Sequence, residues 1–159
     1  METLDKSRFI GVFNKFNDDL RAYNGSQFVS FTTGVAAKWE SYKPIIRNIG
    51  VQRLEADKWT TNDVGSGSIL AAVIRAIEIK ESEDVRNNLV PWEPRHNQPS
   101  ETSRLREELR NGPARLRFER HVFDLFRERR EPAEILDDLV DLIGRRYSLI
   151  AYLFYVFDD

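Results

Sequence analysis

The side chains best suited to acid–base or metal chemistry are the two histidines of the sequence. His121 and Asp124 are three residues apart in a segment predicted to be helical, so they share one helix face, and Glu128 follows one turn later. A metal site needs further ligands that converge on the ion. Such spacing is common on solvated helix faces, so we predict no metal and keep only His121 and Asp124 as a candidate pair. His96 lies in a proline-rich segment, where no carboxylate is identifiable that would orient it as a general base.

A Gly-Ser-Gly-Ser run at 65–68 could bind a phosphate on the free amides of the following helix. It lacks the Lys-Ser/Thr ending of a nucleotide-binding loop, and no clear strand precedes it, so a turn and helix cap are favoured. Asp137, Asp138 and Asp141 resemble a carboxylate cluster, but the helix dipole already explains Asp137 and Asp138, and no glycine-containing calcium loop is present. The chain has no cysteine, which excludes disulfides, thiolate zinc sites and a cysteine nucleophile. We therefore predict a protein that is not an enzyme and has no cofactor.

Arginine outnumbers lysine by 18 to 6, and ten of the arginines lie between Arg95 and Arg130. Arginine binds phosphates in a bidentate manner, which makes one face a candidate for nucleic-acid binding. The candidate residues are Arg104, Arg106, Arg110, Arg115, Arg117 and Arg120. Acidic residues are interleaved with them, and segment 131–159 has two basic against seven acidic residues. Pairing within the protein is therefore favoured, with nucleic-acid binding as the alternative.

Aromatic residues support a different function, because tryptophan, tyrosine and arginine anchor protein interfaces. The candidate interaction residues are Trp92, Tyr152, Tyr155 and Phe157. Three of them belong to an apolar run, Leu149–Phe157. We expect this run to be buried in the core of its own domain; the alternatives are that it contacts a partner or that the chain is cut at a module boundary. The leading hypothesis is a helical interaction or assembly module that docks to a partner protein or to itself.

The elements that would position these residues are predicted to be helices. Apolar residues recur every three or four positions from Phe9 to Tyr23, and Asn24-Gly25 ends that helix. We predict an all-α fold of about six or seven helices around a buried central helix at 69–80, with one short β element as an option near 27–33. A helix is favoured over a strand for Leu149–Phe157.

The domain prediction is one compact domain made of two helical halves, 1–86 and 101–159, joined by a proline-rich connection at 87–100. The net charge of −2 argues against a uniformly basic nucleic-acid binder. No signal peptide or membrane-spanning run is predicted, so we expect a cytoplasmic protein with no membrane partner.

Two strings resemble a known group of proteins. Asn87-Asn88-Leu89-x-x-Trp92 and the run Gly144–Phe154 are similar to helical regions of uncharacterised bacterial restriction-associated proteins, some of them linked to HNH-type nucleases. The resemblance covers about the second half of the chain, contains no catalytic residue, and lacks the nuclease motif. It implies a recognition or assembly role in bacterial DNA defence.

Overall fold

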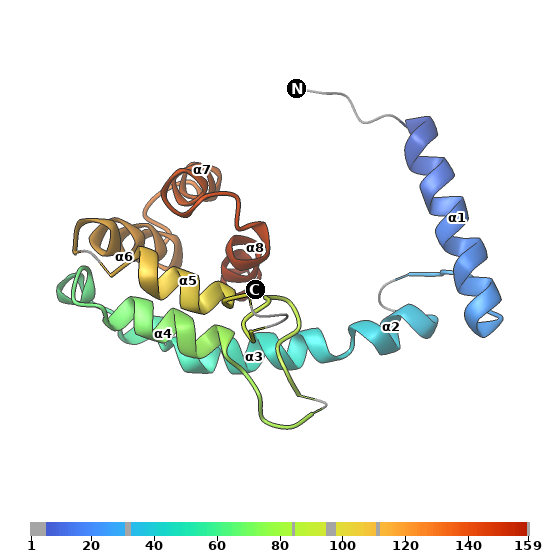
Figure 1. Cartoon of the computed structure of the whole chain (residues 1–159), viewed down its shortest axis with the longest axis horizontal. Coiled ribbons are helices and arrows are strands. Elements are labelled where there is room, and N and C mark those ends of the chain that lie inside the picture. Colours follow the sequence, from blue (N-terminus) through green and yellow to red (C-terminus); the bar gives the residue numbers. More distant parts are fainter. Residues whose placement is uncertain (1–5, 31–32, 84, 95–97, 111, 159) are drawn as a thin grey trace. The chain divides into compact units, whose positions relative to one another are not determined.

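The computed structural model describes residues 6–30, 33–83, 85–94, 98–110 and 112–158. Across these residues the regular structure is helical, which confirms the predicted all-α class (Figure 1). The α-helices are α1 (Lys6–Asn24), α2 (Gly34–Glu40), α3 (Tyr42–Leu54), α4 (Ser68–Ile77), α5 (Glu101–Glu108), α6 (Gly112–Phe126), α7 (Pro132–Ile143) and α8 (Tyr147–Phe157). Two 3-10 turns, η1 (Ala56–Lys58) and η2 (Thr61–Asp63), lie between α3 and α4.

The chain divides into two compact units, Met1–Lys43 and Pro44–Asp159. The predicted connection at 87–100 lies inside the second unit. Its described part is tied to the neighbouring elements: the Asn87 side chain donates to the Ile77 carbonyl at 2.8 Å, and the Glu101 amide donates to the Pro91 carbonyl at 3.0 Å. The prolines make this segment irregular, but its hydrogen bonds hold it within one unit.

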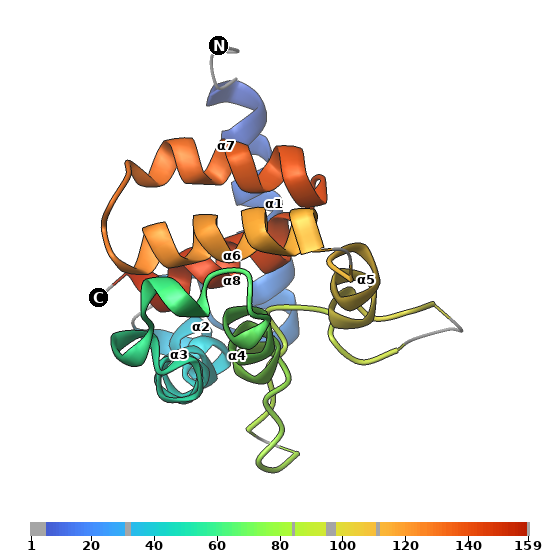
Figure 2. The same ribbon diagram turned by 90° about the vertical axis from the view of Figure 1, so that its left-hand side faces the viewer.

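The core of the second unit forms around α4, as predicted for 69–80, although the helix ends at Ile77. Its buried residues are Ile69, Leu70, Ala72, Val73, Ile74, Ala76 and Ile77. Helix α6 packs against both α4 and α7, and Figure 2 shows it between them. A helix with apolar residues on nearly every side is stable only where neighbours cover most of its surface, which explains the central position of α4.

The apolar run at the end of the chain is a helix, as favoured from the sequence. Helix α8 buries Leu149, Ile150, Tyr152, Leu153 and Val156 in the second unit. Its hydrophobic material therefore completes the core of its own chain.

In the first unit, the chain after α1 turns at Gly25, whose φ of 75° is easily adopted by glycine and whose amide donates to the Arg21 carbonyl at 2.8 Å. The β element expected near 27–33 is not found at residues 27–30 and 33, and residues 31–32 lie outside the described parts. The residues between α1 and α2 are instead irregular.

No helix among the described residues is long and apolar enough to cross a membrane.

Candidate interaction surface

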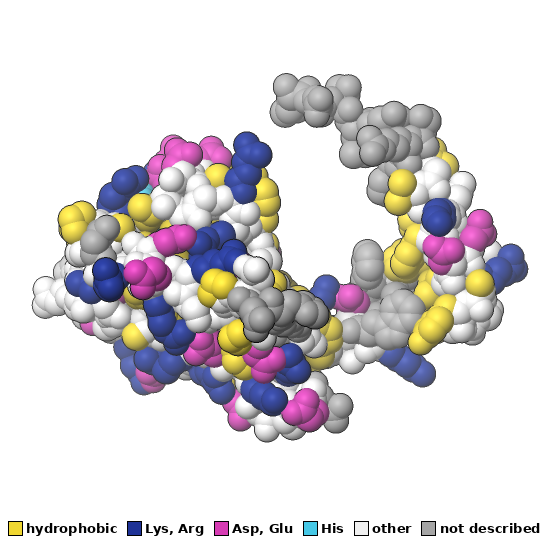
Figure 3. All heavy atoms as spheres, in the orientation of Figure 1, with side chains coloured by type: hydrophobic (Ala, Val, Ile, Leu, Met, Phe, Trp, Pro, Cys, Tyr) yellow, Lys and Arg dark blue, Asp and Glu magenta, His cyan; other side chains and the backbone are white. Residues whose placement is uncertain are grey.

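The aromatic face of α1, defined here as Ile10, Val12, Phe13, Phe16 and Tyr23, is the main apolar surface of the first unit. The three- and four-residue spacing that makes α1 a helix also places most of these side chains along one side of it. They are 55%, 65%, 38%, 40% and 81% exposed, respectively. Figure 3 shows hydrophobic side chains along α1 on the molecular surface.

One residue from the following segment packs on this face. The Phe28 ring meets the rings of Phe13 and Phe16 edge-on, with centroids 5.9 and 5.7 Å apart. The Phe28 amide donates to the Asn17 side chain at 3.1 Å, which holds the returning chain beside α1. These contacts cover Phe13 and Phe16 in part, and both remain more than a third exposed.

The burial of the two units differs strongly. Among the described hydrophobic residues of the first unit, Leu20 is buried, at 4% exposure, whereas the rest of the buried core belongs to the second unit. The apolar surface buried by the described side chains of this unit is therefore small compared with the entropy lost in ordering the chain. The exposed aromatic face is therefore available to bury against another surface.

Charge is distributed unevenly along α1. The Lys15 ammonium lies 4.0 Å from the Asp19 carboxylate, and Asp18 directly precedes Asp19. The side-chain charge therefore changes from positive to negative within four residues in the middle of the helix. Arg21 follows in the last turn of α1, so the two acidic residues lie between basic ones. A helix with this order of charges has a preferred direction of pairing with another charged helix.

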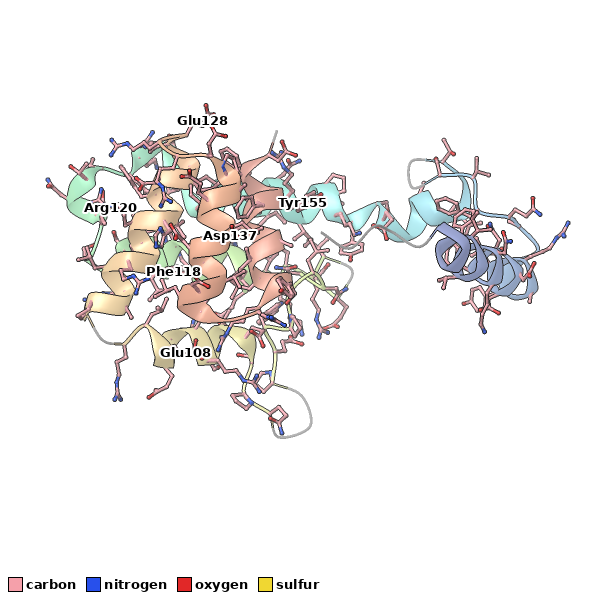
Figure 4. All side chains as sticks on the ribbon, turned by 90° about the horizontal axis from the view of Figure 1, so that it is seen from above. Glu108, Phe118, Arg120, Glu128, Asp137 and Tyr155 are labelled. Carbon is pink, nitrogen blue, oxygen red and sulfur yellow. The ribbon has the colours of Figure 1, made fainter. Side chains whose placement is uncertain are left out.

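The four interaction residues predicted from the sequence lie elsewhere, in the second unit. Trp92 is half-buried, and its indole donates to the Asn87 carbonyl at 2.9 Å. Tyr155 (Figure 4) and Phe157 are also half-buried, and the Phe157 ring lies 5.8 Å from that of Phe126.

Tyr152 differs from the other three because it is only 2% exposed. Its hydroxyl donates to the Ala76 carbonyl at 2.5 Å, and burial raises the pKa of this phenol. Tyr152 thus belongs to the core, and a partner cannot reach it without unfolding α8.

Three of the six candidate arginines are paired with carboxylates of the protein. Arg106 binds Glu78 in a bidentate manner, at 2.9 and 3.0 Å. Arg104 and Arg110 lie 3.8 Å from Glu101 and Glu107, in helical i,i+3 pairs. The pairing favoured from the sequence therefore occurs at these arginines, although the partner of Arg106 is the residue directly after α4 rather than one from the acidic helix.

The other three candidate arginines lie on α6. Arg115 donates to the Gly65 carbonyl at 3.3 Å. Arg117 and Arg120 (Figure 4) are exposed and form no ion pair with any residue in the described ranges. Of the six arginines, three form ion pairs within the protein, Arg115 bonds to a backbone carbonyl, and Arg117 and Arg120 are exposed.

The structure does not assemble a metal site around His121. Its Nδ1 lies 3.5 Å from the Asp138 carboxylate and 3.4 Å from Arg130, while Asp124 is buried at 8% exposure. Burial lowers the pKa of His121, with Arg130 adding to this effect and Asp138 opposing it. Within the described residues, no group of three or more candidate ligands could hold a metal ion. His96 lies outside the described residues.

The Gly-Ser run at 65–68 does bind an anion on its backbone amides, but the anion belongs to the protein. The fully buried Glu119 carboxylate accepts hydrogen bonds from the amides of Gly65, Gly67 and Leu70 at 2.7, 3.1 and 2.9 Å. The turn and helix cap favoured from the sequence are present. The sequence does not identify Glu119 as the residue that these amides bind, because 49 to 54 residues separate it from them.

No protein-family model, curated protein or solved structure matches this chain.

Proposed function

We propose that this chain is a non-enzymatic helical module that associates with a second copy of itself through the aromatic face of α1. The observation that carries the proposal is the contrast in burial: the first unit leaves five large apolar side chains of one helix exposed and, among its described hydrophobic residues, buries Leu20, while the rest of the buried core belongs to the second unit. Exposed apolar side chains on one helix face are typical of surfaces that become buried on association.

The order of charges along α1 supports a second copy as the partner and an antiparallel arrangement. Two antiparallel copies that cross between residues 16 and 17 would bring Lys15 opposite Asp18, and Ile10 opposite Tyr23. A parallel arrangement would bring Lys15 opposite Lys15 and Asp18 opposite Asp18, which is unfavourable. Complementary charges add specificity, and burial of the aromatic side chains supplies most of the free energy of association.

The test is sedimentation velocity of the full chain over a wide range of concentrations. We expect a monomer–dimer equilibrium that is weakened at least tenfold by the double change Val12→Gln and Tyr23→Gln. These side chains are 65% and 81% exposed, so the change leaves the packing within the unit intact. The matched control is Tyr147→Gln, at a tyrosine that is 59% exposed in the second unit.

A wild-type chain that stays monomeric at every concentration would overturn the proposal, as would a dimer that the double change leaves intact. A concentration-independent, compact monomer would instead show that α1 covers a surface of its own chain. Circular dichroism of the variants verifies that their helix content is unchanged.

The direction of pairing can be tested by disulfide cross-linking, because the chain contains no cysteine of its own. We expect a mixture of Ile10→Cys and Tyr23→Cys chains to form the mixed disulfide in good yield. Each variant alone should form little disulfide, since equal positions lie far apart in an antiparallel pair. Efficient cross-linking of either variant with itself would show a parallel pair.

Exposed arginines on α6 favour nucleic-acid binding as the second candidate function. Arg117 and Arg120 are free cations within the described surface, whereas Arg106 is engaged by Glu78. Binding to generic DNA or RNA through phosphates would weaken steeply as salt is raised, and Arg117→Glu with Arg120→Glu would abolish it. Absence of salt-dependent binding by the wild-type chain would remove this candidate.

A cytoplasmic location is part of the proposal and is supported by the absence of cysteine among 159 residues, which fits a reducing compartment. The bacterial DNA-defence context stays a prediction from the resemblance alone.

A further inference from the structure

A groove of about 380 Å³ lies on the second unit, along the side of α4 that faces α5 and the start of α6. It is separate from the aromatic face of α1 and uses none of its residues. Its floor is apolar, formed by Leu70, Ala71 and Ile74. Leu70 and Ile74 are nearly buried, whereas Ala71 is exposed, so the open side of α4 presents a small side chain to the groove.

The rim of the groove carries an excess of positive charge. Arg75, Arg106 and Arg115 line it together with one carboxylate, Glu78, which leaves two positive charges without a counter-charge inside the groove. Arg106 is held by its two bonds to Glu78, and Glu78 also accepts from the Thr102 hydroxyl at 2.6 Å. Arg75 is exposed and forms no ion pair with a described residue.

Arg115 is the other unbalanced cation. Its guanidinium donates to the Gly65 carbonyl at 3.3 Å, and its buried Nε has no acceptor within the described structure. Because this Nε is buried, a ligand in the groove could meet Arg115 only at the outer edge of its guanidinium. A carboxylate could bind the outer edge of this guanidinium, since arginine and carboxylate match in geometry.

We propose that this groove binds a short acidic peptide segment in which an aliphatic side chain lies next to carboxylates. The aliphatic side chain covers Ala71 between Leu70 and Ile74, and the carboxylates pair with Arg75 and Arg115. The apolar floor favours a peptide over a nucleic-acid backbone, because a phosphodiester chain brings no aliphatic group to the floor.

The probe is a fluorescein-labelled 12-residue peptide of glutamate and leucine, spaced to form an amphipathic helix, and binding to the full chain is followed by fluorescence anisotropy. We expect saturable binding that Arg75→Glu weakens at least tenfold. The matched control is Arg145→Glu, at an exposed arginine after α7, which carries the same change of charge outside the groove and should alter affinity less than twofold.

Two further arms separate the apolar and electrostatic contributions. Replacement of every leucine of the peptide by serine keeps its charge and should weaken binding at least tenfold. Ala71→Phe fills the floor from an exposed position without changing the charge, and it should weaken binding to a similar extent. Circular dichroism and thermal unfolding verify that both protein variants are folded.

Three outcomes would overturn the proposal. The first is absence of binding, and the second is binding that neither Arg75→Glu nor Ala71→Phe weakens. The third is binding of a 12-nucleotide single-stranded DNA more tightly than the peptide with the same sensitivity to Arg75→Glu, which would identify the groove as a nucleic-acid site. All variants keep the aromatic face of α1, so these results are independent of self-association.

Discussion

At the scale of single residues, Glu119 explains why the glycine- and serine-rich turn has the shape of an anion site. Gly65 and Gly67 adopt positive φ angles of 90° and 96°, which direct their amides toward the Glu119 carboxylate. A buried carboxylate is tolerable only when hydrogen bonds replace its lost hydration, and three amides do so here. A phosphate ligand would have to displace this carboxylate.

We expect Glu119→Ala to lower the free energy of unfolding by about 3 kcal/mol, because it leaves three amides at the start of α4 without their acceptor. Glu119→Gln keeps an acceptor oxygen and should cost less. Urea denaturation measures both changes, with the exposed Glu107→Ala as control. A loss below about 1 kcal/mol for Glu119→Ala would contradict this role.

His121 predicts how stability changes in mild acid. Its pKa in the folded protein is lowered, chiefly by burial, so the unfolded chain binds this proton more tightly. Stability should therefore fall as the pH drops below 6.5, by no more than about 1.4 kcal/mol per pH unit. His121→Gln should flatten the decline between pH 6.5 and 5, as measured by urea denaturation at each pH. An unchanged slope in that variant would contradict the assignment.

At the scale of elements, the contact between α3 and α8 depends on a glycine. A Cβ at Gly50 would lie 2.6 Å from the Tyr152 hydroxyl and 3.3 Å from Val156. The absence of a side chain at Gly50 lets α8 approach closely enough for Tyr152 to bond to the Ala76 carbonyl of α4. One small residue thus allows three helices to meet.

We expect Gly50→Ala to lower the free energy of unfolding by about 2 kcal/mol, because Tyr152 must move and lose its hydrogen bond. Tyr152→Phe removes the hydroxyl that clashes with the new methyl group. The double variant should therefore lose less stability than the sum of the two single changes, as measured in a double-mutant cycle by urea denaturation. Strict additivity would contradict the proposed clash.

At the scale of the whole molecule, the two units contribute differently. The second unit contains the packed helices and nearly all of the buried hydrophobic residues described, so it supplies the cooperative stability of the chain. The first unit presents the aromatic face of α1. Under the proposed function, the second unit stabilises the chain and the first unit supplies the surface for association.

Truncation to residues 44–159 should leave the cooperative unfolding transition of the second unit in place, within about 1 kcal/mol of the full chain, because its core is complete without the first unit. The same truncation should abolish dimer formation in sedimentation experiments. Loss of cooperative unfolding would show that the first unit is part of the core. A truncated chain that still dimerises would place the interface outside α1.

Local patterns determined much of what the sequence could predict. The spacing of apolar residues identified α1 and α4, and Gly25 marks the end of α1 in the structure as well. These features are predictable because each involves residues within a few positions of one another. The apolar face of α1 could also be predicted from the sequence. The sequence does not specify which surface, if any, contacts this face.

Sequence alone determined the all-α class, helices such as α1, α4 and α8, and the absence of cysteine. Tertiary structure decided which charges neutralise each other, which aromatic residues are accessible, and where the chain divides. Glu119 and the turn at 65–68, Arg106 and Glu78, and Tyr152 and Ala76 meet across 28 or more residues. Side-chain types set what such groups can do, but only the packing of helices brings them within bonding distance, because distant pairs leave no periodic signal along the chain.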